Sequence, residues 1–271
     1  MLRRKISDAR FLHLLLKLIR VEVIGSDGEV RKNTCGVPQG SILSPLLCNV
    51  FLHHVVDEWF KETNAREFAG RCSLTRYADD MVFTAQSVGA AQRLHSLLSA
   101  RLTAHGMTLH EGKTRVILNG RVAAYAQANG GPEVPGFSFL GFLHVWGISR
   151  GRASGKAFWR VKRRTCPQRY RAKLAAIQDH IKRNRQDKRI VEKMKAVVRG
   201  YLNYFAINDN MKRIGMFVHE VRRILFKWLN RRSQCRSFTW EQFANVLKRA
   251  QFPTPKLQHN LFFTTSAFPG G

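Results

Sequence analysis

Hydrophobic residues recur every three to four positions over much of the chain, which is the spacing of helices with one buried face. Ser44 is the expected N-cap of one such helix and Pro45 its first residue, because proline fits where a helix leaves its backbone N–H groups unpaired. The helices predicted in this way cover approximately residues 6–20, 45–61, 88–105, 167–184, 190–206, 211–231 and 239–250.

Apolar and polar residues alternate in short stretches of the first 146 residues, as in half-buried strands. The segment 126–136 is rich in Gly and Pro and predicts a linker, and the basic, glycine-containing segment 147–166 is the expected domain boundary. Mixed α/β sequence followed by helices alone predicts an α+β protein with domains at 1–146 and 167–271. The predicted strands are 73–78, 81–85, the end of 106–118 and 137–146, with a further hairpin at 23–30.

Basic residues far outnumber acidic ones in this chain. There are 46 Lys and Arg against 18 Asp and Glu, a formal net charge of +28. From residue 151 onward, 28 basic and 6 acidic residues give +22. This charge exceeds what solubility requires and predicts a polyanionic partner, with the C-terminal part as the main binding region. Solvated helix faces are the alternative explanation.

Cysteine usage and hydropathy bear on the location of the protein. The longest apolar stretch, 11–19, is too short to span a bilayer and is interrupted by His13 and Lys17, so we expect no membrane partner. An odd number of widely spaced cysteines without a C-x-x-C pair argues against a disulfide framework and a zinc ribbon, and predicts a cytoplasmic protein. These cysteines are Cys35, Cys48, Cys72, Cys166 and Cys235.

Residues 76–83, RYADDMVF, place Asp79 and Asp80 side by side between two predicted strands. Adjacent carboxylates repel each other and lose hydration in apolar surroundings, so the pair costs stability unless it is compensated. A hairpin turn, where Asp is common, is one explanation. Divalent cations are the other, because Mg²⁺ binds carboxylate oxygens and two such ions serve nucleotidyl transfer.

Several motifs, in this order, resemble the reverse transcriptases encoded by group II introns, which are also intron maturases. The motifs are GVPQGSILSPLLCNVFL (36–52), RYADDMVF (76–83), GMTLHEGKTRVI (106–117), FSFLGF (137–142), GYLNYF (200–205) and VRRILFKWLNRR (221–232). The resemblance implies an RNA-directed DNA polymerase with a palm, an antiparallel sheet with packed helices, in 1–146. It implies a helical thumb or maturase domain in 167–271. The implied partners are intron RNA, an RNA template with a DNA primer, and dNTP, and the implied cofactor is Mg²⁺, as two ions in the complete enzyme.

The resemblance also implies roles for individual residues. Asp79 and Asp80 match the catalytic, metal-binding aspartates, and Lys113 matches a lysine near the triphosphate that can protonate the leaving pyrophosphate. Lys113 as a solvated charge and the Phe-Leu-Gly-Phe alternation as core packing are the ordinary alternatives. The positions that match substrate-binding residues are Pro38, Gln39, Gly40, Tyr77 and Ala78, and those that match the primer grip are Phe139, Leu140, Gly141 and Phe142.

Other polar residues have simpler explanations. His53, His54 and Asp57 have metal-like spacing on one predicted helix, but we expect them to be surface polar residues. Asp8 is the expected salt-bridge partner at a helix end.

Family members carry a third metal-binding aspartate and the fingers ahead of the segment that matches residue 1. We therefore expect a truncated chain, a misassigned start, or half of a split enzyme completed by a separate fingers-containing chain. A non-catalytic RNA-binding remnant that assists splicing is the alternative from another functional class.

Overall fold

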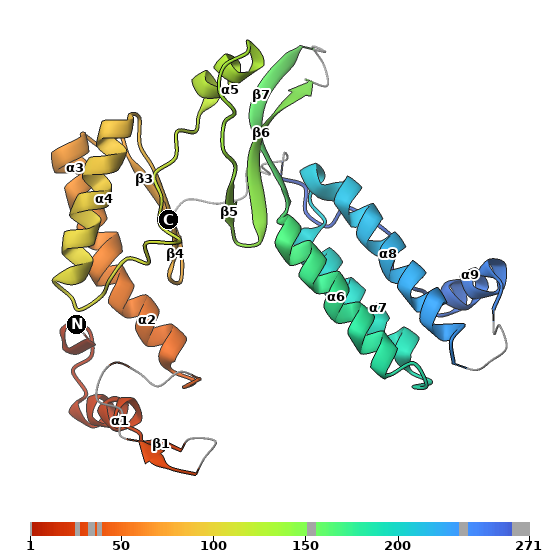
Figure 1. Cartoon of the computed structure of the whole chain (residues 1–271). Coiled ribbons are helices and arrows are strands. Elements are labelled where there is room, and N and C mark those ends of the chain that lie inside the picture. Colours follow the sequence, from red (N-terminus) through yellow and green to blue (C-terminus); the bar gives the residue numbers. More distant parts are fainter. Residues whose placement is uncertain are drawn as a thin grey trace. The chain divides into compact units, whose positions relative to one another are not determined.

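Amphipathic helices and short antiparallel strands make up the chain in the computed structural model (Figure 1). The structure describes residues 2–24, 28–31, 36, 40–150, 156–232 and 238–261. Two units, 1–117 and 118–271, each hold their own buried core. The division therefore falls between Ile117 and Leu118, whereas the sequence placed it within 147–166.

The first unit begins with a short 3₁₀ helix, Leu2–Arg4, and helix α1, Ala9–Ile19. The Asp8 carboxylate accepts hydrogen bonds from the backbone N–H groups of Arg10 and Phe11 at 2.8 and 3.2 Å. Asp8 thus caps the helix, a role that differs from the expected salt bridge. The predicted hairpin follows as β1, Val23–Ile24, and β2, Val30–Arg31, while its tip at 25–27 lies outside the described residues.

A long helix then runs through three segments, namely α2 (Ser44–Leu52), the π-helical η2 (His53–Asp57) and α3 (Glu58–Phe68). Its N-cap is Leu43, without a side-chain cap bond, so the prediction of Ser44 as N-cap is wrong by one residue. The helix ends at Ala69, whose φ of 49° is left-handed, instead of near residue 61.

The hairpin of β3, Ser73–Tyr77, and β4, Asp80–Thr84, packs with α4, Val88–Thr103. The two strands and the helix were predicted, but β3 ends one residue earlier than expected and β4 begins one residue earlier. No strand forms in 106–118, because a strand needs a hydrogen-bonded neighbour and no described segment pairs with it there. The core of this unit consists of Leu52, Val55, Val56, Leu98 and Leu102 in one cluster, and Phe60, Phe68, Cys72 and Leu94 in another.

The second unit starts with helix α5, Arg121–Ala128, so the predicted linker 126–136 begins inside a helix. A three-stranded antiparallel sheet follows in the order β5 (Phe137–Phe139), β6 (Phe142–Arg150) and β7 (Ala157–Thr165). The segment 137–146, expected to be a single strand, thus contains β5, a turn and the first part of β6, which continues to Arg150.

The expected basic linker is also largely strand, in spite of its charge. Arg160 and Arg163 on β7 both lie within ion-pair distance of the buried Asp209, which offsets their charge. Their aliphatic stems can cover apolar surface while the charged ends stay at its edge. Composition alone therefore indicated a linker where the fold has a strand.

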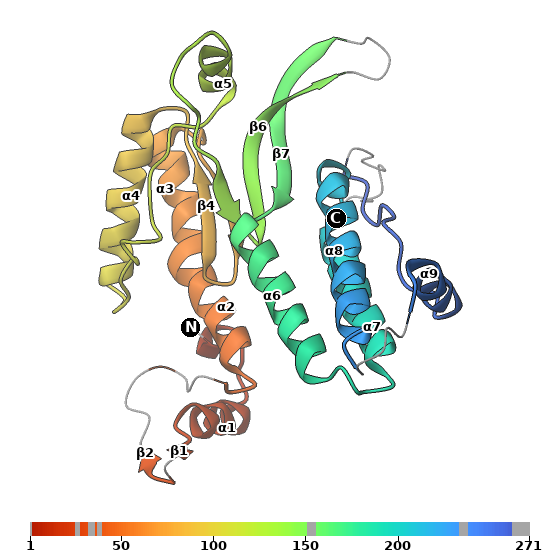
Figure 2. The same ribbon diagram turned by 45° about the vertical axis from the view of Figure 1, so that its right-hand side comes forward.

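A bundle of helices completes the second unit (Figure 2). The helices are α6 (Pro167–Arg183), α7 (Ile190–Phe205), α8 (Met211–Leu229) and α9 (Trp240–Arg249), with a short 3₁₀ turn at Asn208–Asn210. All four helices were predicted within two residues at each end. Their core includes the fully buried side chains of Ile181, Ile190, Val198, Phe217, Leu225 and Phe243.

Candidate active site

The turn between β3 and β4 contains only two residues. Tyr77 pairs with Asp80 across the hairpin, so Ala78 and Asp79 form the turn itself. Ala78 has a φ of 53°, in the left-handed region that costs a residue with a Cβ about 1–2 kcal/mol. Both aspartates are exposed at this end of the hairpin.

Strand pairing determines which side chains near the turn share a face. Arg76 opposes Met81, and both side chains are partly buried. Tyr77 opposes Asp80 on the other face, where the Tyr77 side chain is 66% exposed. The hairpin therefore presents a phenol ring and two carboxylates to solvent at one place.

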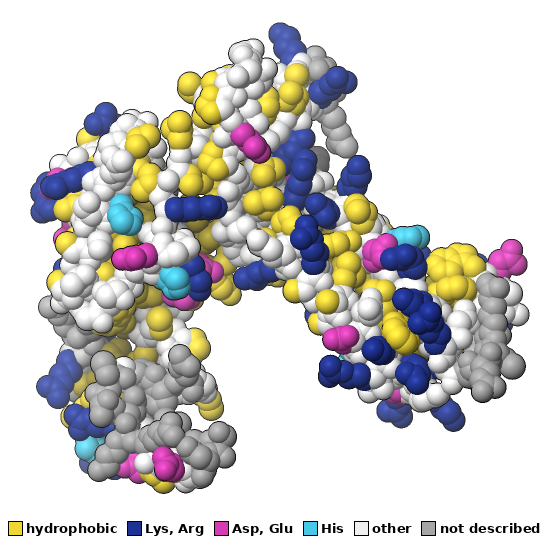
Figure 3. Space-filling view, viewed as in Figure 1, with side chains coloured by type: hydrophobic (Ala, Val, Ile, Leu, Met, Phe, Trp, Pro, Cys, Tyr) yellow, Lys and Arg dark blue, Asp and Glu magenta, His cyan; other side chains and the backbone are white. Residues whose placement is uncertain are grey.

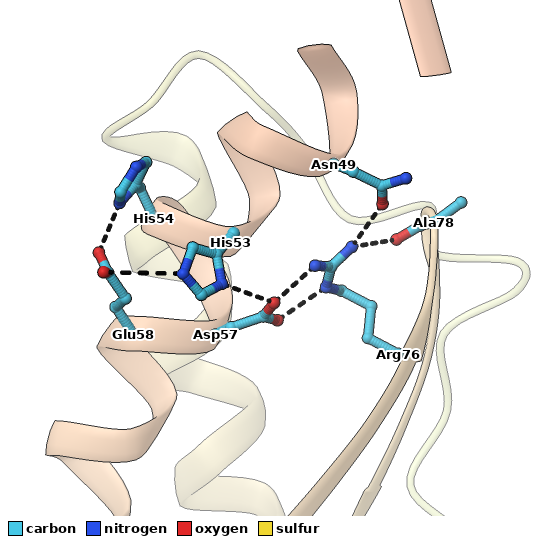
Figure 4. A network of polar contacts seen from close by, with 7 residues as sticks. All are labelled: Asn49, His53, His54, Asp57, Glu58, Arg76 and Ala78. Atoms are coloured by element: carbon cyan, nitrogen blue, oxygen red, sulfur yellow. Dashed lines mark hydrogen bonds and ion pairs between the residues drawn. The ribbon is translucent and has the colours of Figure 1, made fainter. Parts of the chain in front are cut away.

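Arg76 connects the hairpin to the long helix (Figure 4). Its Nε and Nη2 atoms donate to the two carboxylate oxygens of Asp57 at 2.7 and 2.5 Å. Its Nη1 atom donates to Asn49 Oδ1 at 3.1 Å and to the backbone oxygen of Ala78 at 3.0 Å. The hydrogen bond from Arg76 lowers the pKa of Asp57 against the opposing effect of partial burial, so this carboxylate stays charged.

The two histidines near Asp57 take part in the same network (Figure 4). His53 Nδ1 lies 3.4 Å from Asp57 Oδ2, and His54 Nδ1 lies 2.6 Å from Glu58 Oε2. Asp57 was expected to be a surface residue, and its side chain is 29% exposed, but it also pairs with an Arg76 side chain that is only 13% exposed. Sequence analysis missed Arg76, although an arginine at an inward-facing strand position requires a partner.

The chemistry of the donors at the turn fits a magnesium ion. Asp79 and Asp80 offer carboxylate oxygens, the hard ligands that Mg²⁺ prefers, and Mg²⁺ usually keeps several waters beside one or two carboxylates. Within the part of the chain that the structure describes, no group of three or more His, Cys, Asp or Glu side chains is placed to hold a metal. The turn therefore offers two carboxylates, which by themselves would make up only part of a coordination shell.

Lys113 belongs to the same unit as the two aspartates. It lies exposed in a turn in which its backbone N–H donates to the His110 carbonyl at 3.0 Å. Met107 and Leu109, just ahead of this turn, pack against the cluster that Met81 of β4 also contacts. The fold thus attaches the Lys113 segment and the aspartate hairpin to one core.

The loop expected to border the substrate is described only in part. Gly40 is exposed and has a φ of 89°, which favours glycine. Pro38 and Gln39 lie outside the described residues.

The four residues that match the primer grip form the β5–β6 turn of the second unit. Leu140 and Gly141 both have positive φ, 49° and 79°, as a two-residue mirror-image turn requires. Tyr204 Oη donates to the Leu140 carbonyl at 2.9 Å, and the Phe142 ring stacks on the Tyr204 ring. The turn therefore packs on α7, and its residues lie in a different unit from Asp79 and Asp80.

The helical bundle carries both buried and accessible aromatic rings. Tyr201 stacks on Phe217 in the core, and burial raises its pKa to about 12. Tyr204 is 52% exposed. Cationic groups of Lys182, Lys227 and Arg231 lie 5.5–5.9 Å from the ring centre of Trp228. Figure 3 shows Lys and Arg side chains over the sheet and the helices of this unit.

Two further predictions concern cysteines and membranes. Cys48, Cys72 and Cys166 are free thiols, and Cys35 and Cys235 lie outside the described residues. Among the described helices, none has the length and apolar character needed to cross a bilayer.

Comparison with known proteins shows what the chain is similar to. Residues 3–144, more than half of the chain, match the family model "Reverse transcriptase (RNA-dependent DNA polymerase)". The putative COX1/OXI3 intron 1 protein of Saccharomyces cerevisiae is 43% identical over 61 residues, which are 22% of this chain and 7% of that protein. The intron 2 protein of the same yeast is 37% identical over 67 residues, 25% of this chain and 8% of that protein.

A more distant relative is the telomerase reverse transcriptase of Rattus norvegicus. It is 29% identical over 110 residues, which are 41% of this chain and 9% of that protein. The matched parts span less than a tenth of each of these three relatives.

Proposed function

This chain belongs to the reverse transcriptase (RNA-dependent DNA polymerase) family, and from this premise we propose that it acts as a group II intron-encoded reverse transcriptase and maturase. The observation that carries the proposal is the exposed two-residue turn with Asp79 and Asp80, which lies inside the family-matched region. Its reaction is the transfer of a nucleotide from dNTP to a primer 3′ hydroxyl on an RNA template.

The proposed site assigns a task to each exposed group near the turn. Asp79 and Asp80 hold Mg²⁺, which when bound activates the primer hydroxyl and holds the triphosphate. Lys113 donates a proton to the leaving pyrophosphate, because a cation at a developing negative charge lowers the barrier. Tyr77 and Ala78 border the primer end and the incoming nucleotide. The loop of Pro38, Gln39 and Gly40 lies along the templating base and the nucleotide.

The second unit binds RNA and the primer duplex in this proposal. Support comes from the 28 basic residues against 6 acidic ones after residue 150. Further support comes from the cations around Trp228, since cations and aromatic rings together bind phosphates and unstacked bases. The apolar side chains of the turn at residues 139–142 contact the primer strand.

A non-catalytic RNA-binding splicing factor is the second candidate. The small number of metal donors favours this candidate. The described residues supply two carboxylates at the turn and no group of three or more potential metal ligands. In that case the basic unit acts on intron RNA and the hairpin is a relic. A split enzyme, in which a separate fingers-containing chain completes the site, would also be inactive as the isolated chain.

Primer extension distinguishes the polymerase from the splicing factor. We expect residues 1–271 alone not to extend a DNA primer on RNA with Mg²⁺, because the described residues place no group of three or more carboxylate, His or Cys side chains where they could hold the metal. Joined behind the N-terminal segment of an intron-encoded reverse transcriptase, the chain should extend the primer. The Asp79→Asn substitution in this chimera should lower extension by more than about 100-fold, since metal ions contribute several kcal/mol to such reactions.

The control is Glu62→Gln, which neutralises an exposed carboxylate on α3 of the same unit and should leave extension unchanged. RNA binding should be the same in all variants. A chimera that extends primers equally well with Asp79→Asn would show that the metal assignment is wrong.

A further inference from the structure

Arg76 connects the long helix to the β3–β4 turn. Four of its N–H groups are used, by Asp57, Asn49 and the Ala78 carbonyl, and its side chain is only 13% exposed. The helix and the turn are thus joined through one planar, rigid guanidinium. We propose that Arg76, held by Asp57 and Asn49, is a positioning residue that fixes the backbone of the turn carrying Asp79.

The Ala78 carbonyl is the point at which this contact acts on the metal-binding carboxylate. The carbonyl of residue 78 and the N–H of residue 79 belong to one planar peptide unit, so fixing one orients the other. Ala78 holds a left-handed φ of 53°, a conformation that persists where surrounding contacts determine it. Arg76 supplies such a contact at 3.0 Å.

The π-helical segment brings the two anchors of Arg76 onto one face of the long helix. Asn49 and Asp57 are eight residues apart, which in a regular α-helix would place them about 80° apart around the axis. A π turn accommodates one extra residue, so the two lie as if seven residues, or nearly two turns, separated them. Both side chains then reach the same guanidinium.

The other end of β3 is attached to the same helix. Asn64 Nδ2 donates to the Cys72 carbonyl at 2.8 Å, and the Cys72 N–H donates to Asn64 Oδ1 at 3.0 Å. With Asn64 at the start of the strand and Asp57 near its end, β3 is held at both ends. Only the turn extends beyond these attachments, and the Arg76 contact with Ala78 restrains it.

Hydrogen–deuterium exchange tests the backbone restraint without reference to any metal. In the full chain, Arg76→Lys keeps the charge but lacks the fork that reaches both Asp57 and Ala78. Asp57→Asn removes the ion pair and leaves the hairpin sequence unchanged. Both variants should exchange the amides of residues 77–80 about tenfold faster than the wild type, with α4 unchanged. Unchanged exchange at 77–80 in folded Asp57→Asn overturns the proposal.

The matched control is Arg93→Lys, which alters an exposed arginine 3.6 Å from Glu67 in the same unit. It should change neither the exchange of residues 77–80 nor Mn²⁺ binding.

Binding of Mn²⁺, measured by electron paramagnetic resonance, tests the consequence for the proposed metal site. Because this step rests on the proposed function, Asp79→Asn is measured first and should abolish binding. Arg76→Lys and Asp57→Asn are then measured at a temperature well below the melting temperature of each variant. Both should raise the Mn²⁺ Kd about tenfold. A merely stabilising ion pair would lower the melting temperature and leave this Kd unchanged, which would overturn the proposal. If Asp79→Asn binds Mn²⁺ like the wild type, the proposed metal site fails, while the exchange data still decide the role of Arg76.

Discussion

Asp209 is an acidic residue whose side chain is 3% exposed in a strongly basic unit. Burial alone would raise its pKa, but the hydrogen bond and charge of Arg160, with a smaller effect of Arg163, lower it. A carboxyl whose pKa is lower in the folded state stabilises the protein above its unfolded pKa, and this stability is lost as the pH falls through the folded value. The stabilisation should therefore be complete at pH 7 and decline below about pH 4.

The Asp209→Asn variant should be less stable than the wild type by about 3 kcal/mol at pH 7, because it leaves Arg160 without its charged partner. Denaturant unfolding at pH 7, 5, 4 and 3 measures this, and the difference between the two proteins should shrink toward pH 3. Asp179→Asn, on the exposed side of α6, is the control and should change little. A constant difference across this pH range would contradict the assigned role of the Asp209 charge.

The π-helical segment η2 sets the register of the helix on which the hairpin rests. Deletion of the exposed His53 should turn η2 into regular α-helix and leave Asn49 and Asp57 seven residues apart, on the same face. The variant should fold, with a melting temperature within about 5 °C of the wild type, since a change of about 1 kcal/mol shifts it by that much.

Insertion of an alanine after His53 is the matched change in the opposite direction. It should rotate Asn49 by about 100° away from Arg76, since each residue of an α-helix turns that far. Thermal unfolding followed by circular dichroism compares the two variants. Equal destabilisation by deletion and insertion would show that the π turn does not control the register.

The whole molecule combines a moderately basic first unit with a second unit that carries most of the positive charge. If the second unit binds RNA phosphates, the affinity of the full chain should fall steeply with salt, because each neutralised phosphate releases counterions. Replacing Lys182, Lys227 and Arg231 by alanine should reduce the slope of log K against log salt by about 2, at roughly 0.7–0.9 per phosphate contact.

Filter binding of intron RNA at several salt concentrations measures this slope. The matched control replaces Lys61, Arg66 and Arg93, three exposed basic residues of the first unit. A slope that is unchanged by the first triple substitution, or reduced equally by the second, would place the RNA contacts elsewhere.

Local sequence determined a large part of this protein. The bundle helices were predictable because Ile190, Val198 and Leu225 belong to apolar patterns whose period depends only on neighbouring residues. The β3–β4 hairpin was predictable for the same reason, and its motif, with the other motifs, identified the family. The exposed position of Asp79 in the turn followed from the strand pattern, whereas Asp80, also expected between the strands, is the first residue of β4.

Tertiary structure decided the contacts between segments that are distant in the sequence. The basic segment 157–165 is a strand because it pairs with β6. Asp209, which lies 49 residues after Arg160 in the sequence, offsets the positive charge of that strand. Arg76 finds its anchors at Asn49 and Asp57 only because a π turn aligns them. Such contacts depend on which surfaces pack together in the folded chain. The local period of apolar residues does not specify which distant segments these are.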